Sequence, residues 1–289
     1  MGYAISSIPR YFLLPGIYDH ADPWKFVFGP SITLLVTLLI PQLRVPQSLR
    51  VSLIGFLASI HLFLGSRSLA VITLLTMFTL FRNQNHRKFE LRIFLGLAVS
   101  IISVFLFADI YGNLAANGTL GDRQQAKYLQ QKNAGPLILT GRSELLYELN
   151  AIKETGLLGL GSNPDLSTKI LNSVAVDEYR FGVRHDATTS YLGYRANNKI
   201  PNHSMIFTSW LEGGILAALF WFYILLTGIK WFGRISGKDL PFGLAANYLG
   251  INFFWALLFS PLGAGSRVIL AFTLGLMYVQ QRGKQLDQS

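Results

Sequence analysis

The chain has no cysteine and few charged residues. The absence of cysteine excludes disulfides, thiolate metal sites and a cysteine nucleophile. Only 14% of the 289 residues are charged, whereas 51% are hydrophobic, and soluble domains usually carry about 25% charged residues. Together with a mean hydropathy of +0.38, this composition predicts a membrane protein.

The formal net charge of +10 is not gathered into a basic face. Lysine and arginine alternate along the chain with long apolar runs. Positive charge next to apolar runs is typical of membrane topology signals and of contact with lipid headgroups. We therefore expect membrane lipids as partners, and no nucleic acid.

Familiar metal-binding patterns are also missing. The segment 111–204 shows no HExxH motif, no carboxylate cluster and no DxD-like pair. This argues against a zinc peptidase and a divalent-metal sugar transferase, and it weakens a two-carboxylate glycosidase interpretation. We expect no metal and no other cofactor.

Apolar runs of membrane-spanning character recur along the chain. A helical span needs roughly 20 mostly apolar residues. The candidates are residues 26–41, 51–65, 67–81, 92–110, 205–229, 241–261 and 265–281. The predicted fold is therefore an all-α polytopic membrane protein with about seven transmembrane helices. Gly65 and Arg67 separate the second and third candidates, which form either two tight spans or a broken hairpin.

The short connections between these runs indicate the orientation. Most of their lysines and arginines lie on one side, as in the connection with Arg82, Arg87, Lys88 and Arg92. That side is the cytoplasm by the positive-inside rule. The expected organisation is N-terminal helices in 1–110, a large, partly helical periplasmic loop in 111–204, and C-terminal helices in 205–289. The C-terminus is then cytoplasmic, and the membrane is a bacterial inner membrane.

An odd number of spans places the N-terminus outside as well. Residues 1–25 show no basic segment followed by an apolar one, so no cleavable signal sequence is visible. Our hypothesis is that the chain is the C-terminal part of a longer membrane protein. A reading frame that extends upstream in phase would support it, and a stop just before Met1 would contradict it.

The predicted loop contains one amphipathic helix and one glycine-rich turn. Between 142 and 155, an apolar face is formed by Leu145, Leu146, Leu149 and Ile152. The carboxylates at 144 and 148 fall on other faces. Gly156 is placed to end this helix, and the closely spaced glycines of 156–161 predict a tight turn at the membrane surface.

Basic residues and one histidine are the candidate functional groups. The arginines expected on the outer side include Arg67, Arg142, Arg184 and Arg195. Guanidinium groups bind phosphates bidentately, which indicates an anionic substrate; ordinary phospholipid headgroups are the alternative. His203 immediately precedes the span at 205–229 and is placed for chemistry on a lipid headgroup. A surface histidine at the end of the span is its alternative interpretation.

Three motifs give the chain a resemblance to the O-antigen ligase and O-antigen polymerase superfamily of bacterial envelopes. They are SRSL at 66–69, GRSELLYEL…IKETGLLGLG at 141–161 and PNHSMIFTSWLEGG at 201–214. Their order and their common outer side are similar to that family, from about residue 26 to the C-terminus. Leu69 and Leu146 depart from the residues that are common there.

The resemblance implies glycosyl transfer from a polyprenyl diphosphate-linked glycan to a hydroxyl of a lipid, glycan or protein acceptor. It implies that Arg67 and Arg142 bind the diphosphate, with Arg184 and Arg195 as further candidates. His203 would be the general base or would orient the acceptor. Glu212 would support this site or would only anchor the span.

Three functions are compatible with the sequence. A ligase joins the finished glycan to an acceptor, whereas a polymerase uses the same donor to lengthen a chain. A transporter of polysaccharide or lipid is the alternative of another class. Transporters commonly show internal repeats and charged or broken helices at mid-membrane. No repeat is visible here and the charges gather at the outer ends of the spans, which favours the enzyme.

Overall fold

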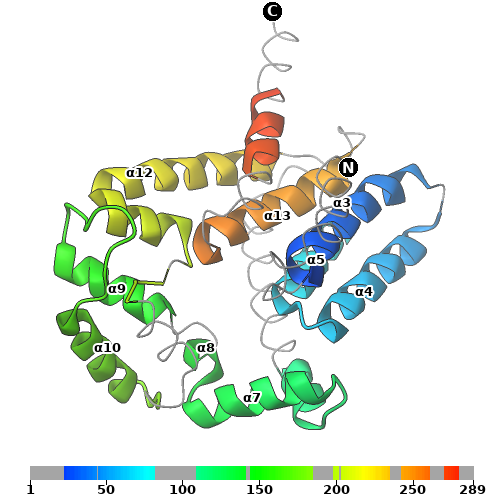
Figure 1. The fold of residues 1–289 in the computed structure, drawn as a ribbon. Helices are drawn as coiled ribbons and strands as arrows, with labels where there is room; N and C mark the ends of the chain where they lie inside the picture. Colours follow the sequence, from blue (N-terminus) through cyan, green and yellow to red (C-terminus); the bar gives the residue numbers. More distant parts are fainter. Residues whose placement is uncertain are drawn as a thin grey trace, which may run out of the picture. The chain divides into compact units, whose positions relative to one another are not determined.

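The computed structural model describes residues 23–43, 45–81, 109–140, 144–184, 198–201, 203–234, 242–260 and 270–279. Helices dominate these ranges (Figure 1), and no β-strand occurs within them apart from an isolated bridge between Asp165 and Lys199. The predicted all-helical class is confirmed for this part of the chain.

Packing divides the chain into two compact units. The first comprises Met1–Leu114, Trp231–Asn252 and Ala271–Ser289, and the second comprises Ala115–Lys230 and Phe253–Leu270. These units are defined by contacts between residues, whereas the predicted boundaries at residues 110 and 204 separate segments on different sides of a membrane. That topological division therefore stays a prediction.

The first unit contains a helical hairpin. Its main elements are η1 (Trp24–Phe28), α3 (Gly29–Leu39), η2 (Ile40–Gln42), α4 (Gln47–Phe63), α5 (Arg67–Phe78) and η3 (Thr79–Phe81). Helices α4 and α5 pack against each other and are joined by residues 64–66. The positive φ of Gly65, 78°, reverses the chain there. The apolar stretch 51–81 is thus two separate helices joined by a tight turn.

A buried histidine in this unit is satisfied by a chain of hydrogen bonds. Trp24 Nε1 donates to His61 Nδ1 (3.0 Å), so Nδ1 carries no proton. His61 Nε2 then donates to Thr33 Oγ1 (2.8 Å), which itself donates to the carbonyl of Gly29 (2.7 Å). Both ring nitrogens of His61 are therefore occupied by hydrogen bonds within the first unit.

The second unit is built around helices of the predicted loop. They are α7 (Asp122–Ala134), α8 (Leu137–Thr140), α9 (Glu144–Thr155) and α10 (Thr168–Arg180), followed by most of α12 (Met205–Arg234) and the end of α13 (Gly243–Phe259). An apolar core that α9 and α10 share with the start of α12 and with residues 166 and 200 consists of Leu146, Tyr147, Ala151, Leu166, Ile170, Val174, Ile200 and Leu211. This core fixes α9 against both α10 and the start of α12.

The buried face of α9 differs from the predicted one. The helix buries Leu146, Tyr147, Glu148, Asn150 and Ala151, whereas three of the four predicted leucine and isoleucine positions are only half-buried. The prediction was wrong because it assumed one partner surface. Helix α9 packs on α10 on one side and meets the start of α12 on another, so its buried surface is wider than one apolar stripe.

The glycine-rich turn docks on a break in α12. The N–H of Leu160 donates to Leu211 O (2.6 Å), that of Gly161 to Glu212 O (3.1 Å), and that of Ile215 to Leu157 O (2.8 Å). At the break, Gly214 has φ 73° and ψ −169°, a region open essentially to glycine alone. The turn predicted at 156–161 is therefore held by backbone bonds to α12.

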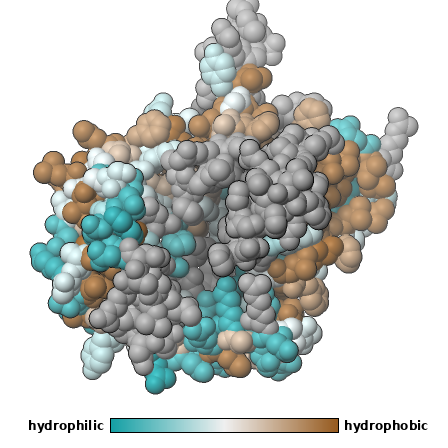
Figure 2. Space-filling view, in the orientation of Figure 1, coloured by the Kyte–Doolittle hydropathy of each residue, from teal (hydrophilic) through white to brown (hydrophobic). Residues whose placement is uncertain are grey.

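Several features of the described helices favour a membrane protein. Within the described ranges one helix, Met205–Phe232, is long and apolar enough to cross a membrane. The shorter apolar helices are Gly29–Gln42, Gln47–Phe63, Arg67–Phe78, Gly243–Phe259 and Leu270–Val279. Large apolar side chains are exposed on α4 and α12 (Figure 2).

The shorter helices coincide with predicted spans, but each has fewer than the roughly 20 residues of a full crossing. The span predicted at 92–110 lies outside the described residues except for its last two. The seven-span topology therefore stays a prediction.

Candidate functional site

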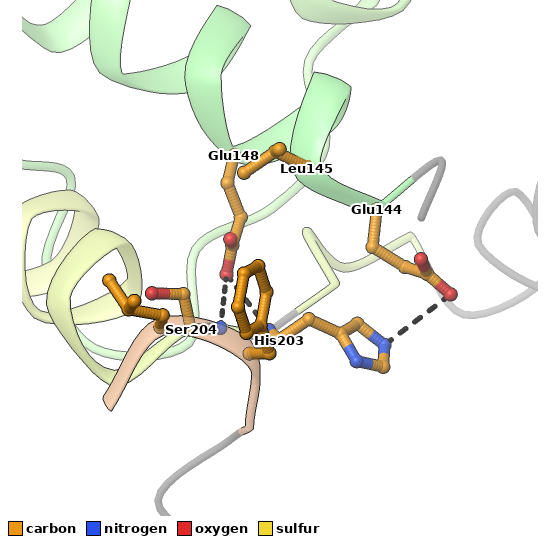
Figure 3. A pocket seen from close by; sticks show the side chains of 7 residues that line it. Glu144, Leu145, Glu148, His203 and Ser204 are labelled. Carbon is orange, nitrogen blue, oxygen red and sulfur yellow. Dashed lines mark hydrogen bonds and ion pairs between the residues drawn. The ribbon is translucent and has the colours of Figure 1, made fainter. Parts of the chain in front are cut away.

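His203 lies at the entrance to α12, opposite the first turn of α9. Its imidazole points toward Glu144, and the distance from His203 Nε2 to Glu144 Oε1 is 3.6 Å (Figure 3). This distance suits an ion pair but exceeds that of a good hydrogen bond. The His203 side chain is 38% exposed and that of Glu144 is 19% exposed, so the pair is reachable from outside.

Glu148 holds the backbone at His203. It is fully buried, and its Oε1 accepts hydrogen bonds from the N–H groups of His203 (2.9 Å) and Ser204 (3.3 Å) and from Thr208 Oγ1 (3.0 Å). The first N–H groups of a helix have no partner within the helix, and a carboxylate there is also favoured by the helix dipole. Glu148 therefore caps α12 from α9 and fixes the position of His203.

Ser204, the residue directly before α12, completes this cap. Its Oγ accepts from the N–H of Phe207 (3.3 Å) and donates to the carbonyl of Leu257 on α13 (3.2 Å). The start of α12 is therefore tied to both α9 and α13. The backbone at residues 203 and 204 is therefore held from two sides.

Burial raises the pKa of Glu148 to about 7, although the hydrogen bonds from His203, Thr208 and Ser204 oppose this rise. The nearby charge of Glu144 adds to it. Among the described residues, Glu148 Oε2 has no hydrogen-bond partner, so this oxygen is the one that can carry the proton. The carboxyl is thus poised between its two protonation states near neutral pH.

A small pocket joins these groups. It is lined by Glu144, Leu145, Glu148, His203, Ser204, Leu258 and Phe259 (Figure 3) and has a volume of about 30 Å³. That is enough room for one water molecule or one hydroxyl group. Two carboxyls and an imidazole therefore converge on a space of that size.

The other predicted site residues lie elsewhere or outside the described ranges. Arg67 begins α5 in the first unit, with its guanidinium 5.0 Å from the centre of the Tyr111 ring. Arg184 is exposed in the second unit, and its N–H donates to the carbonyl of Ala134. Arg142 and Arg195 are not among the described residues. The joint diphosphate site thus stays a prediction.

Glu212 lies on α12 where the turn docks. Its Oε1 accepts from the N–H of Asn163 (3.0 Å), and its carbonyl accepts from Gly161. This contact supports the anchoring alternative for Glu212. The turn that it holds is the one that follows α9.

Sequence reasoning missed the two glutamates. It placed both on faces away from the core and found no carboxylate cluster, whereas the structure brings Glu144 and Glu148 together beside His203. The signal was their spacing of four residues, which puts two side chains on one helical face. Within the described residues, no group of three His, Asp or Glu side chains is placed to hold a metal ion.

The chain was also compared with known protein families, curated proteins and solved structures. No family model, no curated protein and no solved structure matches the chain.

A pH-dependent stability should follow from Glu148. Because the folded state raises its pKa from 4.5 to about 7, the folded protein binds the proton more tightly than the unfolded one. Stability therefore falls as pH rises from about 4.5 to 7, by on the order of 3 kcal/mol, and levels off above that. The Glu148→Gln variant keeps an oxygen that can accept the capping hydrogen bonds, and its stability should no longer fall over this pH range.

The measurement is the thermal unfolding midpoint in detergent between pH 5 and 8. Glu144 and His203 line the same pocket as Glu148, so both proteins should also carry His203→Gln, which removes the imidazole from the comparison. An equal fall in the midpoint with and without Glu148→Gln would show that Glu148 is not the titrating group.

Proposed function

We propose that this chain is a membrane-embedded glycosyltransferase of the O-antigen ligase type. It would act on the periplasmic face of a bacterial inner membrane and move a saccharide from a polyprenyl diphosphate to an acceptor hydroxyl. The observation that carries the proposal is the His203 imidazole, held by Glu148 through the backbone and facing Glu144 at the mouth of an apolar helix.

The reaction needs a base for the acceptor hydroxyl. In the proposed step the imidazole of His203 takes the hydroxyl proton while the acceptor oxygen bonds to the anomeric carbon. The bond from that carbon to the diphosphate breaks, and the diphosphate leaves with the electron pair. Glu144 stabilises the positive charge that the imidazole gains, as the carboxylate does in a catalytic triad.

The leaving diphosphate needs cationic partners. Arg67 and Arg142 are proposed for that role, with Arg184 and Arg195 as further candidates, because a guanidinium binds phosphate oxygens in pairs. The ring of Tyr111 beside Arg67 limits the positions that this guanidinium takes. The polyprenyl chain would lie along the exposed apolar side chains of the membrane helices.

The test is transfer by the chain itself. It would be expressed in one bacterial host that lacks its own O-antigen ligase and in another that lacks its polymerase, both making the lipid-linked glycan. We expect glycan on lipopolysaccharide in the first host; longer glycans in the second would identify a polymerase instead.

A second readout needs no particular acceptor. In vesicles a hydroxyl of a second lipid-linked glycan, or water, can take the glycosyl group, so the purified chain should release polyprenyl diphosphate from the lipid-linked glycan, measured by thin-layer chromatography. Membrane-inserted protein that neither transfers glycan in either host nor releases the diphosphate would contradict the proposal.

A further inference from the structure

The turn that docks on α12 exposes three leucines. Leu157, Leu158 and Leu160 are 65%, 89% and 45% exposed. The three backbone hydrogen bonds to Leu211, Glu212 and Ile215 hold the turn in place, so these side chains cannot fold inward. A fixed turn that presents three neighbouring leucines is unusual for a water-exposed loop and marks an interaction surface.

The turn lies beside the start of the apolar part of α12. After the break at Gly214, residues 215–234 have the roughly 20 residues that a membrane span needs. Leu216 is 78% exposed there, and Leu219 and Phe220 are more than half exposed. Because Ile215 donates to the carbonyl of Leu157, the leucines of the turn sit level with the first turn of that apolar stretch.

Polar groups flank the turn as they do at a membrane surface. Trp210 Nε1 donates to the carbonyl of Gly156 (2.9 Å), and tryptophan is enriched at the headgroup level. Just beyond the turn, Lys199 Nζ contacts the carbonyl of Asn163 (3.0 Å) and a carboxylate oxygen of Asp165 (2.7 Å). The three leucines thus lie between the exposed apolar surface of α12 and the charged pair of Lys199 and Asp165.

We propose that Leu157, Leu158 and Leu160 insert into the lipid leaflet next to α12 and anchor the loop to the bilayer. Helix α9 ends at Thr155, directly before this turn, and it carries Glu144 and Glu148. The anchor therefore sets the height of the His203 pocket above the membrane. The inference requires α12 to span the membrane, as in the proposed function, but it does not depend on glycosyl transfer.

The absence of cysteine makes the test direct, since any introduced cysteine is the only thiol. A fluorophore would be attached to Leu158→Cys in vesicles of phosphatidylethanolamine and phosphatidylglycerol. Nitroxide-labelled lipids, with the nitroxide either near the headgroup or deep in the acyl chain, would serve as quenchers. Leu226→Cys in α12 is the reference for the membrane interior, and Asn172→Cys, exposed on α10, is the reference for water.

Shallow nitroxides should quench the fluorophore at residue 158 at least twofold more than the one at residue 172. Deep nitroxides should quench it at residue 226. Quenching at 226 with none at 158 would overturn the anchor while leaving the span intact. An unquenched residue 226 would overturn the span, and with it both the anchor and the membrane placement in the proposed function.

Discussion

Replacing His203 with glutamine should lower the rate of glycan transfer by roughly 10²- to 10⁴-fold, the usual contribution of a general base. Glutamine keeps a polar side chain of similar reach but cannot take a proton near neutral pH. The substitution should leave the fold intact, because Glu148 binds the backbone N–H of residue 203 and not its side chain. The loss should therefore appear in turnover at unchanged abundance of the protein in the membrane.

Two variants on α9 separate a catalytic effect from a structural one. Glu144→Gln removes the carboxylate that faces the imidazole and should lower the rate by at most about 5-fold, since a partly exposed pair contributes about 1 kcal/mol or less. Glu154→Gln is the matched control, because Glu154 pairs with the exposed Lys169 (2.9 Å) and does not line the pocket. Its rate should equal that of the parent.

The pH profile of transfer gives an independent readout. A general base acts only in its unprotonated form, so the parent's rate should rise with pH. The residual rate of His203→Gln should lack that rise. Full transfer by His203→Gln, with the parent's pH profile, would remove His203 from the mechanism while leaving the diphosphate chemistry open.

The sequence could identify His203 but not what surrounds it. The histidine stands at a visible boundary between a polar segment and an apolar run, and no folding is needed to see that. Glu144 and Glu148 acquire their roles only when α9 meets the start of α12, a contact between residues more than fifty positions apart. Long-range packing of this kind leaves no periodic signal in a single chain.

The helices show the same contrast between local and long-range information. The apolar runs correctly indicated the positions of α4, α5, α12 and α13, because hydropathy is a local property of the sequence. The break in α12 was missed, since Gly213 and Gly214 stand within an otherwise continuous apolar run and glycine is tolerated in such helices. What makes the break necessary is the docking of residues 157–161, which is set by tertiary structure.

Gly214→Ala, at the break in α12, should destabilise the protein more than a glycine-to-alanine change within the docked turn at 156–161. Residue 214 has φ 73° and ψ −169°, which costs a non-glycine residue about 1–3 kcal/mol. An added Cβ would also overlap the carbonyl of Leu157 and lie 2.8 Å from the carbonyl carbon of Leu158. Because these are backbone atoms, relief requires the turn to move, at roughly 1–3 kcal/mol more.

Gly161→Ala is the matched control for backbone strain. Gly161 also has a positive φ, 85°, but no atom lies within 4 Å of an added Cβ. Backbone strain alone should therefore lower the stability of Gly161→Ala, by about 1–2 kcal/mol. In Gly214→Ala both the strain and the loss of the docking contact should lower the stability. The thermal unfolding midpoint in detergent measures both.

A third variant tests the contact from the other side. In Gly159→Ala the added Cβ would lie 2.6 Å from the backbone nitrogen of Gly214, so its loss of stability should approach that of Gly214→Ala. The loss of stability in the double variant should be smaller than the sum of the two single losses, because the second change acts on a contact that the first has already broken. Equal midpoints for Gly214→Ala and Gly161→Ala would instead mean that the turn does not dock on α12, and the membrane anchor would lose its support.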